Sequence, residues 1–147
     1  MVSIKKIDAV DQYDISQYER LMSQIPSFRM RGKELLEYVA KIVLHGTVLV
    51  VDEDGTLRGF AGFYANDFQN RVAYWSSLVI DSSLRGQGWG TRMFDEVKAL
   101  CRNAGMRVVH ATVLKSNQSA QIFHQAHGFV LQEHESDPTR FRMELTL

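Results

Sequence analysis

Three glycines at alternate positions, Gly86, Gly88 and Gly90, separate a long apolar segment from a strongly amphipathic one. The segment before them, residues 72–80, has the length and composition of a strand. The segment after them has apolar side chains at helical spacing and ends at Gly105, a residue that commonly follows a helix. A strand, a glycine-rich turn and a helix in this order indicate an α/β architecture.

The glycine loop has the composition of an anion site. A helix N-terminus carries unpaired N–H groups and a partial positive charge of about +0.5, so it attracts anions. Glycines allow the backbone to approach a bulky anion, and Arg85 adds a cation beside it. The loop is therefore predicted to hold a pyrophosphate. The alternative interpretation is a turn that only starts the helix.

Two known phosphate motifs do not match. A P-loop needs Gly-Lys-Ser/Thr, which the chain lacks. A dinucleotide site needs G-x-G-x-x-G and an acidic residue about 20 positions later, but the loop reads G-x-G-x-G and the next strand, residues 108–114, ends without an acid. A nicotinamide-dependent oxidoreductase is therefore a poor alternative.

The remaining chain alternates between strand and helix patterns without a linker or repeat, which predicts a single domain over residues 1–147. Expected strands are 2–8, 47–51, 57–64, 72–80, 108–114, 129–135 and 140–147, and expected helices are 12–24, 31–45, the segment that ends at Gly105, and 117–127. The order β-α-α-β-β-β-α-β-α-β-β predicts an α/β domain with a mixed sheet.

Composition excludes several classes of protein. The 147 residues carry 17 basic and 17 acidic side chains with no basic stripe, so we expect no nucleic-acid partner. The longest apolar runs, such as residues 48–51, are too short to cross a membrane, and the first eight residues lack the apolar core of a signal peptide. We therefore expect a cytoplasmic protein without membrane contact. No cysteine and histidine set has metal spacing, so no metal is expected.

Two segments resemble the GNAT superfamily of N-acyltransferases. Residues 85–90, Arg-Gly-Gln-Gly-Trp-Gly, fit the acyl-CoA-binding signature [QR]-x-x-G-x-[GA] of that superfamily. Residues 117–120, Asn-Gln-Ser-Ala, together with Gly128-Phe129, resemble a second family segment. The element order also agrees, so the resemblance covers essentially the whole chain.

The resemblance implies a GNAT-like domain with a mostly antiparallel sheet, helices on both faces and a central strand pair that splays apart. It implies acetyl-CoA as the acyl-donor substrate: the strand backbone pairs with the pantetheine arm, the loop amides hold the pyrophosphate, and an amide near Leu78 polarises the acetyl carbonyl. The positions that match the family's cofactor-binding residues are Leu78, Val79, Ile80, Arg85, Gly86, Gln87, Gly88, Trp89, Gly90, Thr91 and Asn117.

The chain departs from the family pattern at His124. Many members carry a tyrosine here, seven residues after the asparagine, whose hydroxyl protonates the leaving thiolate. A protonated histidine can act as this acid, and a neutral one can hydrogen-bond the sulfur. His124 is therefore the predicted catalytic residue. The alternative is a spacer, because a thiolate with a pKa near ~8.5 takes a proton readily from solvent.

The sequence does not single out the residue that deprotonates the acceptor amine. Candidates where the strands open are Tyr64, Asn66, Asp67, Tyr74 and Ser76. Strand alternation predicts that the last two share a face with Leu78. Asn66 and Asp67 also suit a turn.

Two further residues have structural interpretations. Cys101 is predicted to pack in the core and not to act as a nucleophile. His110 is predicted to be a packed or supporting residue.

These features predict an acetyl-CoA-dependent N-acetyltransferase in which a primary amine attacks the thioester directly. The expected acceptor is a small metabolite such as an amino sugar, and the alternative within this class is a protein or peptide amine. A different class, a non-catalytic acyl-CoA-binding module, is favoured only by the missing tyrosine. The last strand, with its alternating pattern, is a candidate for pairing across a homodimer.

Overall fold

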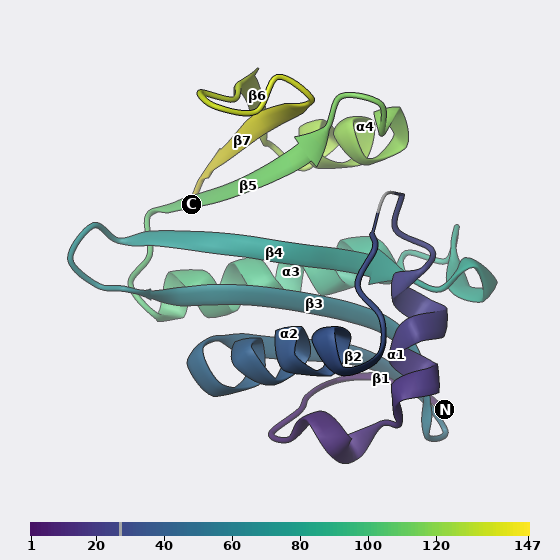
Figure 1. Cartoon of the computed structure of the whole chain (residues 1–147). Coiled ribbons are helices and arrows are strands. Elements are labelled where there is room, and N and C mark those ends of the chain that lie inside the picture. The colour runs from purple at the N-terminus through teal and green to yellow at the C-terminus, as the bar shows by residue number, and fades with distance from the viewer. Residues whose placement is uncertain (27) are drawn as a thin grey trace.

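The computed structural model describes residues 1–26 and 28–147, and the strands of this part form one sheet in the order β1-β2-β3-β4-β5-β7-β6 (Figure 1). The strands are β1 (Val2–Lys6), β2 (Thr47–Glu53), β3 (Thr56–Asp67), β4 (Val72–Ile80), β5 (Val108–Leu114), β6 (Val130–Glu133) and β7 (Arg140–Thr146). The β4–β5 pair is parallel and the other neighbours are antiparallel. The predicted fold class and element order are confirmed.

The helices are α1 (Ile15–Met22), α2 (Gly32–His45), α3 (Trp89–Asn103) and α4 (Gln118–Ala126), with short 3-10 turns η1 (Val10–Gln12) and η2 (Ser82–Leu84). The first helix begins later than predicted because Asp14 caps it: its Oδ1 accepts a hydrogen bond from the Gln17 N–H at 3.1 Å. Within the described residues, every helix is too short or too polar to span a bilayer.

Helices cover both faces of the sheet (Figure 1). Residues of α1 and α2 pack against Val48 and Val50 of β2, while residues of α3 and α4 pack on the face that carries Leu49 and Val51. Successive side chains of a strand point to opposite faces, so a strand covered on both sides has an unbroken apolar run. This double burial explains why residues 48–51 contain no polar side chain.

The central parallel pair separates after a short contact. Val72, Ala73 and Tyr74 of β4 pair with β5, and beyond Tyr74 the two strands diverge (Figure 1). Over its whole length β5 pairs with β7, so in the described sheet the β4 edge from Trp75 onward faces no strand. The predicted splayed strand pair is confirmed.

A bulge at Ser76 corrects one expectation about which side chains share a face. Gly62 pairs with Ser77 and Phe63 pairs with Trp75, so Ser76 is an extra residue in β4. An extra residue reverses the alternation beyond it. Leu78 therefore packs against the α3 core. The prediction that it shares a face with Tyr74 and Ser76 was wrong.

The order of strands also corrects the proposed role of the last strand. β7 lies between β5 and β6, and its residues 141–144 are paired on both sides. Its hydrogen-bonding groups there are already used within the chain. A dimer cannot form by adding a strand to this part of β7, because a free edge is required.

An aromatic cluster between the sheet and α3 provides a test of the core. The Phe94 ring is 1% exposed and lies 4.9 Å from the Trp75 ring, measured between centroids. We predict that Phe94→Ala lowers the free energy of unfolding by about 3–5 kcal/mol in urea titrations, because it leaves a cavity. Phe68→Ala, at a side chain that is 68% exposed, is the control and is expected to cost about 0.5 kcal/mol or less. Equal losses would contradict this packing.

Candidate active site

A cleft of about 620 Å³ lies between the end of β4, the glycine loop and α4. The predicted cofactor-binding residues that line it are Leu78, Val79, Ile80, Arg85, Gly86, Gly88, Trp89, Gly90, Thr91 and Asn117, and His124 lines it as well. Gln87 lies outside this lining, because its side-chain nitrogen donates to the Ser83 carbonyl at 3.3 Å. The fold therefore brings all but one of these residues to a single cleft.

The loop opens the N-terminus of α3 toward this cleft. Gly86 and Gly88 have φ values of 77° and 85°, a left-handed conformation that residues with a Cβ rarely adopt. A Cβ at either position would meet nothing within 4 Å, so the backbone conformation and not space requires glycine. Gly88 is the N-cap and provides no side chain to cap the first N–H groups of the helix. These N–H groups and the helix dipole suit an anion.

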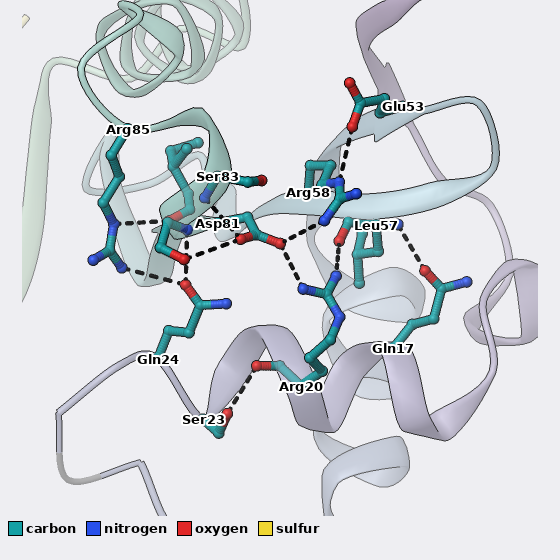
Figure 2. Close-up of polar contacts among 12 residues, drawn as sticks. Gln17, Arg20, Ser23, Gln24, Glu53, Leu57, Arg58, Asp81, Ser83 and Arg85 are labelled. Atoms are coloured by element: carbon teal, nitrogen blue, oxygen red, sulfur yellow. Dashed lines mark hydrogen bonds and ion pairs between the residues drawn. The ribbon is translucent and has the colours of Figure 1, made fainter.

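A buried carboxylate anchors the start of the loop (Figure 2). Asp81 is 3% exposed and accepts hydrogen bonds from Arg20 at 2.5 Å, Arg58 at 3.2 Å and the Ser83 N–H at 3.1 Å. Burial alone would raise the pKa of Asp81, but these hydrogen bonds and the arginine charges hold it well below its usual range. The paired carboxylate ties α1, β3 and the loop together.

Gln24, just after α1, connects the loop to the same helix (Figure 2). Its Oε1 accepts from the Ser82 N–H at 2.9 Å and from Arg85 Nη2 at 3.5 Å. Arg85 also donates from Nε to the Ile80 carbonyl at 3.2 Å. These two bonds orient the Arg85 guanidinium beside the loop amides, and its other N–H donors remain for an anion.

A second cavity, of about 500 Å³, lies where β4 and β5 separate. It contacts both strands, the segment after α1 and the start of β7. Leu78, Asn117 and His124 line this cavity as well as the first cleft. The two cavities therefore meet beside His124, so a group bound in one can reach a group bound in the other.

His124 is held as a neutral ring. Its Nδ1 lies 2.7 Å from the Ala120 carbonyl, which can only accept, so Nδ1 carries the proton and Nε2 is left with a lone pair. Burial is the main cause that lowers the pKa of His124, and the nearby His127 adds to it. In this state the ring can accept a proton at Nε2 and cannot donate one there.

Two other predicted binding residues have structural roles too. Asn117 caps α4, because its Oδ1 accepts from the Ala120 N–H at 3.2 Å, and its amide nitrogen is the end left for a ligand. Thr91 Oγ1 lies 3.1 Å from His127 Nε2. His127 Nδ1 donates to the Phe123 carbonyl, so with a neutral ring Thr91 donates to Nε2, and its backbone N–H stays available to a ligand.

Only some of the candidate bases line a cavity in the structure. Asp67, at the end of β3, accepts from the Asn70 backbone and side chain across the β3–β4 turn. Asn66, also in β3, donates from its side chain to the His45 carbonyl at the end of α2. Both residues lie outside the two cavities. Tyr64 packs against the α1–α2 core. Tyr74 and Ser76 line the second cavity.

Tyr38 is a cavity residue that the sequence did not indicate. Its hydroxyl is 2.5 Å from Ser76 Oγ and donates to Ser77 Oγ at 3.2 Å. The spacing of an aromatic residue along a helix is the same whether its side chain faces a pocket or the core, so the sequence cannot tell these positions apart. Only the packing of α2 on the bulged part of β4 places it here.

Cys101 and His110 take the structural roles that were predicted. Cys101 is 0% exposed in the α3 core, where burial raises the pKa of its thiol, so it is not a nucleophile. His110 contacts Glu144 and Arg142 at 3.1 Å each and lines neither cavity.

Residues 13–129 match the family model described as "Acetyltransferase (GNAT) family". The chain belongs to the GNAT acetyltransferase family. A comparison of the sequence with curated proteins found no match.

Solved GNAT-like structures share the fold over nearly the whole chain. Ard1 from Thermoplasma volcanium is 18% identical with a TM-score of 0.82, covering 99% of this chain and 97% of that one. PaiA N-acetyltransferase from Thermoplasma acidophilum, in complex with coenzyme A, is 15% identical with a TM-score of 0.77 and coverage of 100% and 99%. The ribosomal-protein-S18-alanine N-acetyltransferase from Escherichia coli is 14% identical with a TM-score of 0.76 and coverage of 99% and 94%.

The anchor of the GNAT loop can be tested through Asp81. We predict that Asp81→Asn lowers the free energy of unfolding at pH 7 by about 2–3 kcal/mol, less than for a fully buried pair because the arginines keep contact with water. The carboxylate stabilises the fold above its unfolded pKa, and this contribution is lost as the pH falls through the lowered folded pKa. The difference between variant and wild type, measured by urea unfolding, should therefore shrink below about pH 4.

Asp54→Asn is the matched control, because its ion pair with the N-terminus is exposed on both sides. No measurable change in the free energy of unfolding is expected there, because solvent screens an exposed ion pair. A loss for Asp81→Asn that stays constant down to pH 2 would contradict the role of the charge.

Proposed function

We propose that this protein is an acetyl-CoA-dependent N-acetyltransferase that acetylates a primary amine by direct attack. The observation that carries the proposal is the junction of two cavities beside the neutral ring of His124. One cavity has an anion-binding helix terminus and an open strand edge, and the other offers space for an acceptor. A ternary complex needs such a junction, because the amine must reach the acyl carbon without a covalent enzyme intermediate.

The residues of the first cleft fit acetyl-CoA. The unpaired β4 edge from Trp75 onward can pair with an extended amide-containing arm, as a strand would. The N-terminus of α3 and the left-handed Gly86 and Gly88 suit a pyrophosphate. When bound, acetyl-CoA supplies an activated acyl carbon whose thioester bond breaks as the amide bond forms.

The backbone and Leu78 orient the acyl group. Beyond the bulge at Ser76, Leu78 packs against the α3 core, and its backbone belongs to the edge that faces no strand in the described sheet. An N–H group on this edge can donate to the carbonyl oxygen where negative charge develops. A rigid strand holds such a donor in place more accurately than a loop would.

His124 provides a path for the proton. The attacking nitrogen must lose one proton and the leaving sulfur must gain one. Nε2 of His124 has the free lone pair that accepts the proton, and the resulting imidazolium can return it to the sulfur. The ring thus ends neutral, and the lowered pKa of His124 favours that state before the reaction. This shuttle joins the two roles expected from the sequence, since His124 starts neutral and becomes the protonated acid during the reaction.

The proposed acceptor is a small metabolite such as an amino sugar. The second cavity, at about 500 Å³, has the size of a small-molecule pocket. A protein or peptide amine is the alternative, which the shared fold with the S18-alanine N-acetyltransferase favours. A non-catalytic acyl-CoA-binding module is the alternative of a different class.

Release of free CoA thiol separates these functions. We predict that the protein releases thiol from acetyl-CoA only when a suitable amine is added, across a panel of amino sugars, amino acids and peptides. Acetyl-CoA should also raise the melting temperature, because a ligand that binds only the folded state stabilises it. A thermal shift without any turnover would support the binding module, and no shift with any CoA ester would overturn the proposal.

His124→Phe tests the proton shuttle. The substitution keeps a ring beside Phe123 and Phe129 but removes Nε2, and we predict a fall in kcat of about 10²–10⁴-fold. In the wild type, kcat at saturating substrates should fall as the pH drops through a pKa below 6.5, because the protonated ring cannot accept. This titration should be absent from the variant.

His45→Gln is the control for loss of a histidine. His45 is exposed at the end of α2 and lines neither cavity. Its kcat and pH profile should match the wild type. An unchanged kcat in His124→Phe would assign His124 a spacer role.

A further inference from the structure

We propose that the acceptor amine also carries an anionic group, a carboxylate or a phosphate, which Arg140 and His134 bind in the second cavity. This inference rests on the proposed function and names the substrate class of the same site. Both residues line the cavity, His134 from the turn after β6 and Arg140 from the first position of β7. Arg140 lies opposite Leu114 of β5, at the open end of the separated strands.

The charge that lines the cavity is of one sign, positive. The chain has 17 acidic residues, yet among the described residues that line this cavity there is no aspartate or glutamate. Arg140 is the permanently charged side chain of this lining. A polycationic acceptor would find no carboxylate to pair with there, and an anionic acceptor would find a cation.

The guanidinium of Arg140 keeps donors for a ligand. Its Nε lies 3.5 Å from Asp137 Oδ2, and within the described residues neither terminal nitrogen has a hydrogen-bond partner. The other oxygen of Asp137 accepts from the N–H and hydroxyl of Thr139, at 2.9 and 2.6 Å. Asp137 therefore orients the guanidinium without saturating it. Its planar pair of terminal nitrogens matches a carboxylate or phosphate.

His134 is fixed as a second donor. Its Nδ1 accepts from the backbone N–H groups of Asp137 at 2.9 Å and Ser136 at 3.2 Å. A nitrogen that accepts carries no proton, so the proton lies on Nε2, which can donate. His134 and Arg140 thus both contribute donors, whereas His124 contributes an acceptor. The amine and the anionic group have separate complementary partners in one cavity.

The remaining lining suits the carbon skeleton of such a molecule. Ile25, Pro26, Phe28 and Met30 form an apolar wall after α1.

An NMR titration tests the anion site without knowledge of the acceptor. The full chain is saturated with CoA, so that the loop site is filled, and titrated with inorganic phosphate and separately with acetate. We expect the Arg140 Nε–H and His134 resonances to shift with one or both anions, and the stronger response distinguishes a phosphorylated from a carboxylated acceptor. The Arg142 Nε–H is the internal control, because that guanidinium contacts Glu135, Glu144 and His110. Absence of a shift at Arg140 with both anions overturns the inference.

Kinetics with a matched pair of amines, glucosamine and glucosamine 6-phosphate, tests selectivity. The wild type should prefer the phosphorylated amine, and Arg140→Met should raise its KM by about 10–100-fold while changing that of glucosamine by about 3-fold or less. Asp137→Asn removes the partner of Arg140 but keeps the cation, so it should preserve the preference. If Arg140 only stabilises the turn, both variants will affect both amines alike, which contradicts the inference.

The two proposals fail in different ways. Faster turnover of glucosamine than of its phosphate by the wild type would overturn the anionic acceptor and leave the N-acetyltransferase standing. Thiol release from no amine, together with clear shifts at Arg140, would retain the anion site and count against the N-acetyltransferase.

Discussion

The early end of pairing between β4 and β5 is the constraint on which the site depends. Each strand already has a partner on its other side, β3 for β4 and β7 for β5, so the two can separate after Tyr74 without losing the sheet. The separation leaves backbone donors and acceptors of β4 facing a cleft. Unpaired backbone groups need a partner, and an extended amide-containing ligand provides one. The two cavities lie along this gap.

The bulge at Ser76 allows one strand to serve both cavities. Before it, Tyr74 points to the α2 face, and beyond it Leu78 and Ile80 point to the α3 face while Val79 packs with α1 and α2. A regular strand would keep one set of side chains on one face throughout. The extra residue also brings Ser76 and Ser77 to the Tyr38 hydroxyl, which ties α2 to the strand at the cavity wall.

Charge is distributed differently at the two ends of the site. At the loop, a buried carboxylate is neutralised by two arginines and fixes the backbone that presents its N–H groups. At the second cavity, the described lining has a cation and no carboxylate. Burial lowers the pKa of the histidine at the junction and favours its neutral form, and the bond to the Ala120 carbonyl fixes the proton on Nδ1. The first arrangement supports structure, and the second determines which protonation states the reacting groups adopt.

The sequence by itself determined the element order, the glycine loop and most of the cofactor cleft, because these follow from local patterns: apolar periodicity, left-handed glycines and a contiguous family signature. It could not determine the bulge, since one extra residue at Ser76 leaves no mark in composition. Nor could it assign a proton to His124, because the bond to Ala120 and the burial of the ring exist only in the folded chain. Tyr38 comes to the second cavity from α2, and His134 and Arg140 come from the β6–β7 region far along the chain, through helix packing and strand register. Local interactions set the secondary structure and the loop, and long-range packing alone decided which side chains surround the reacting groups.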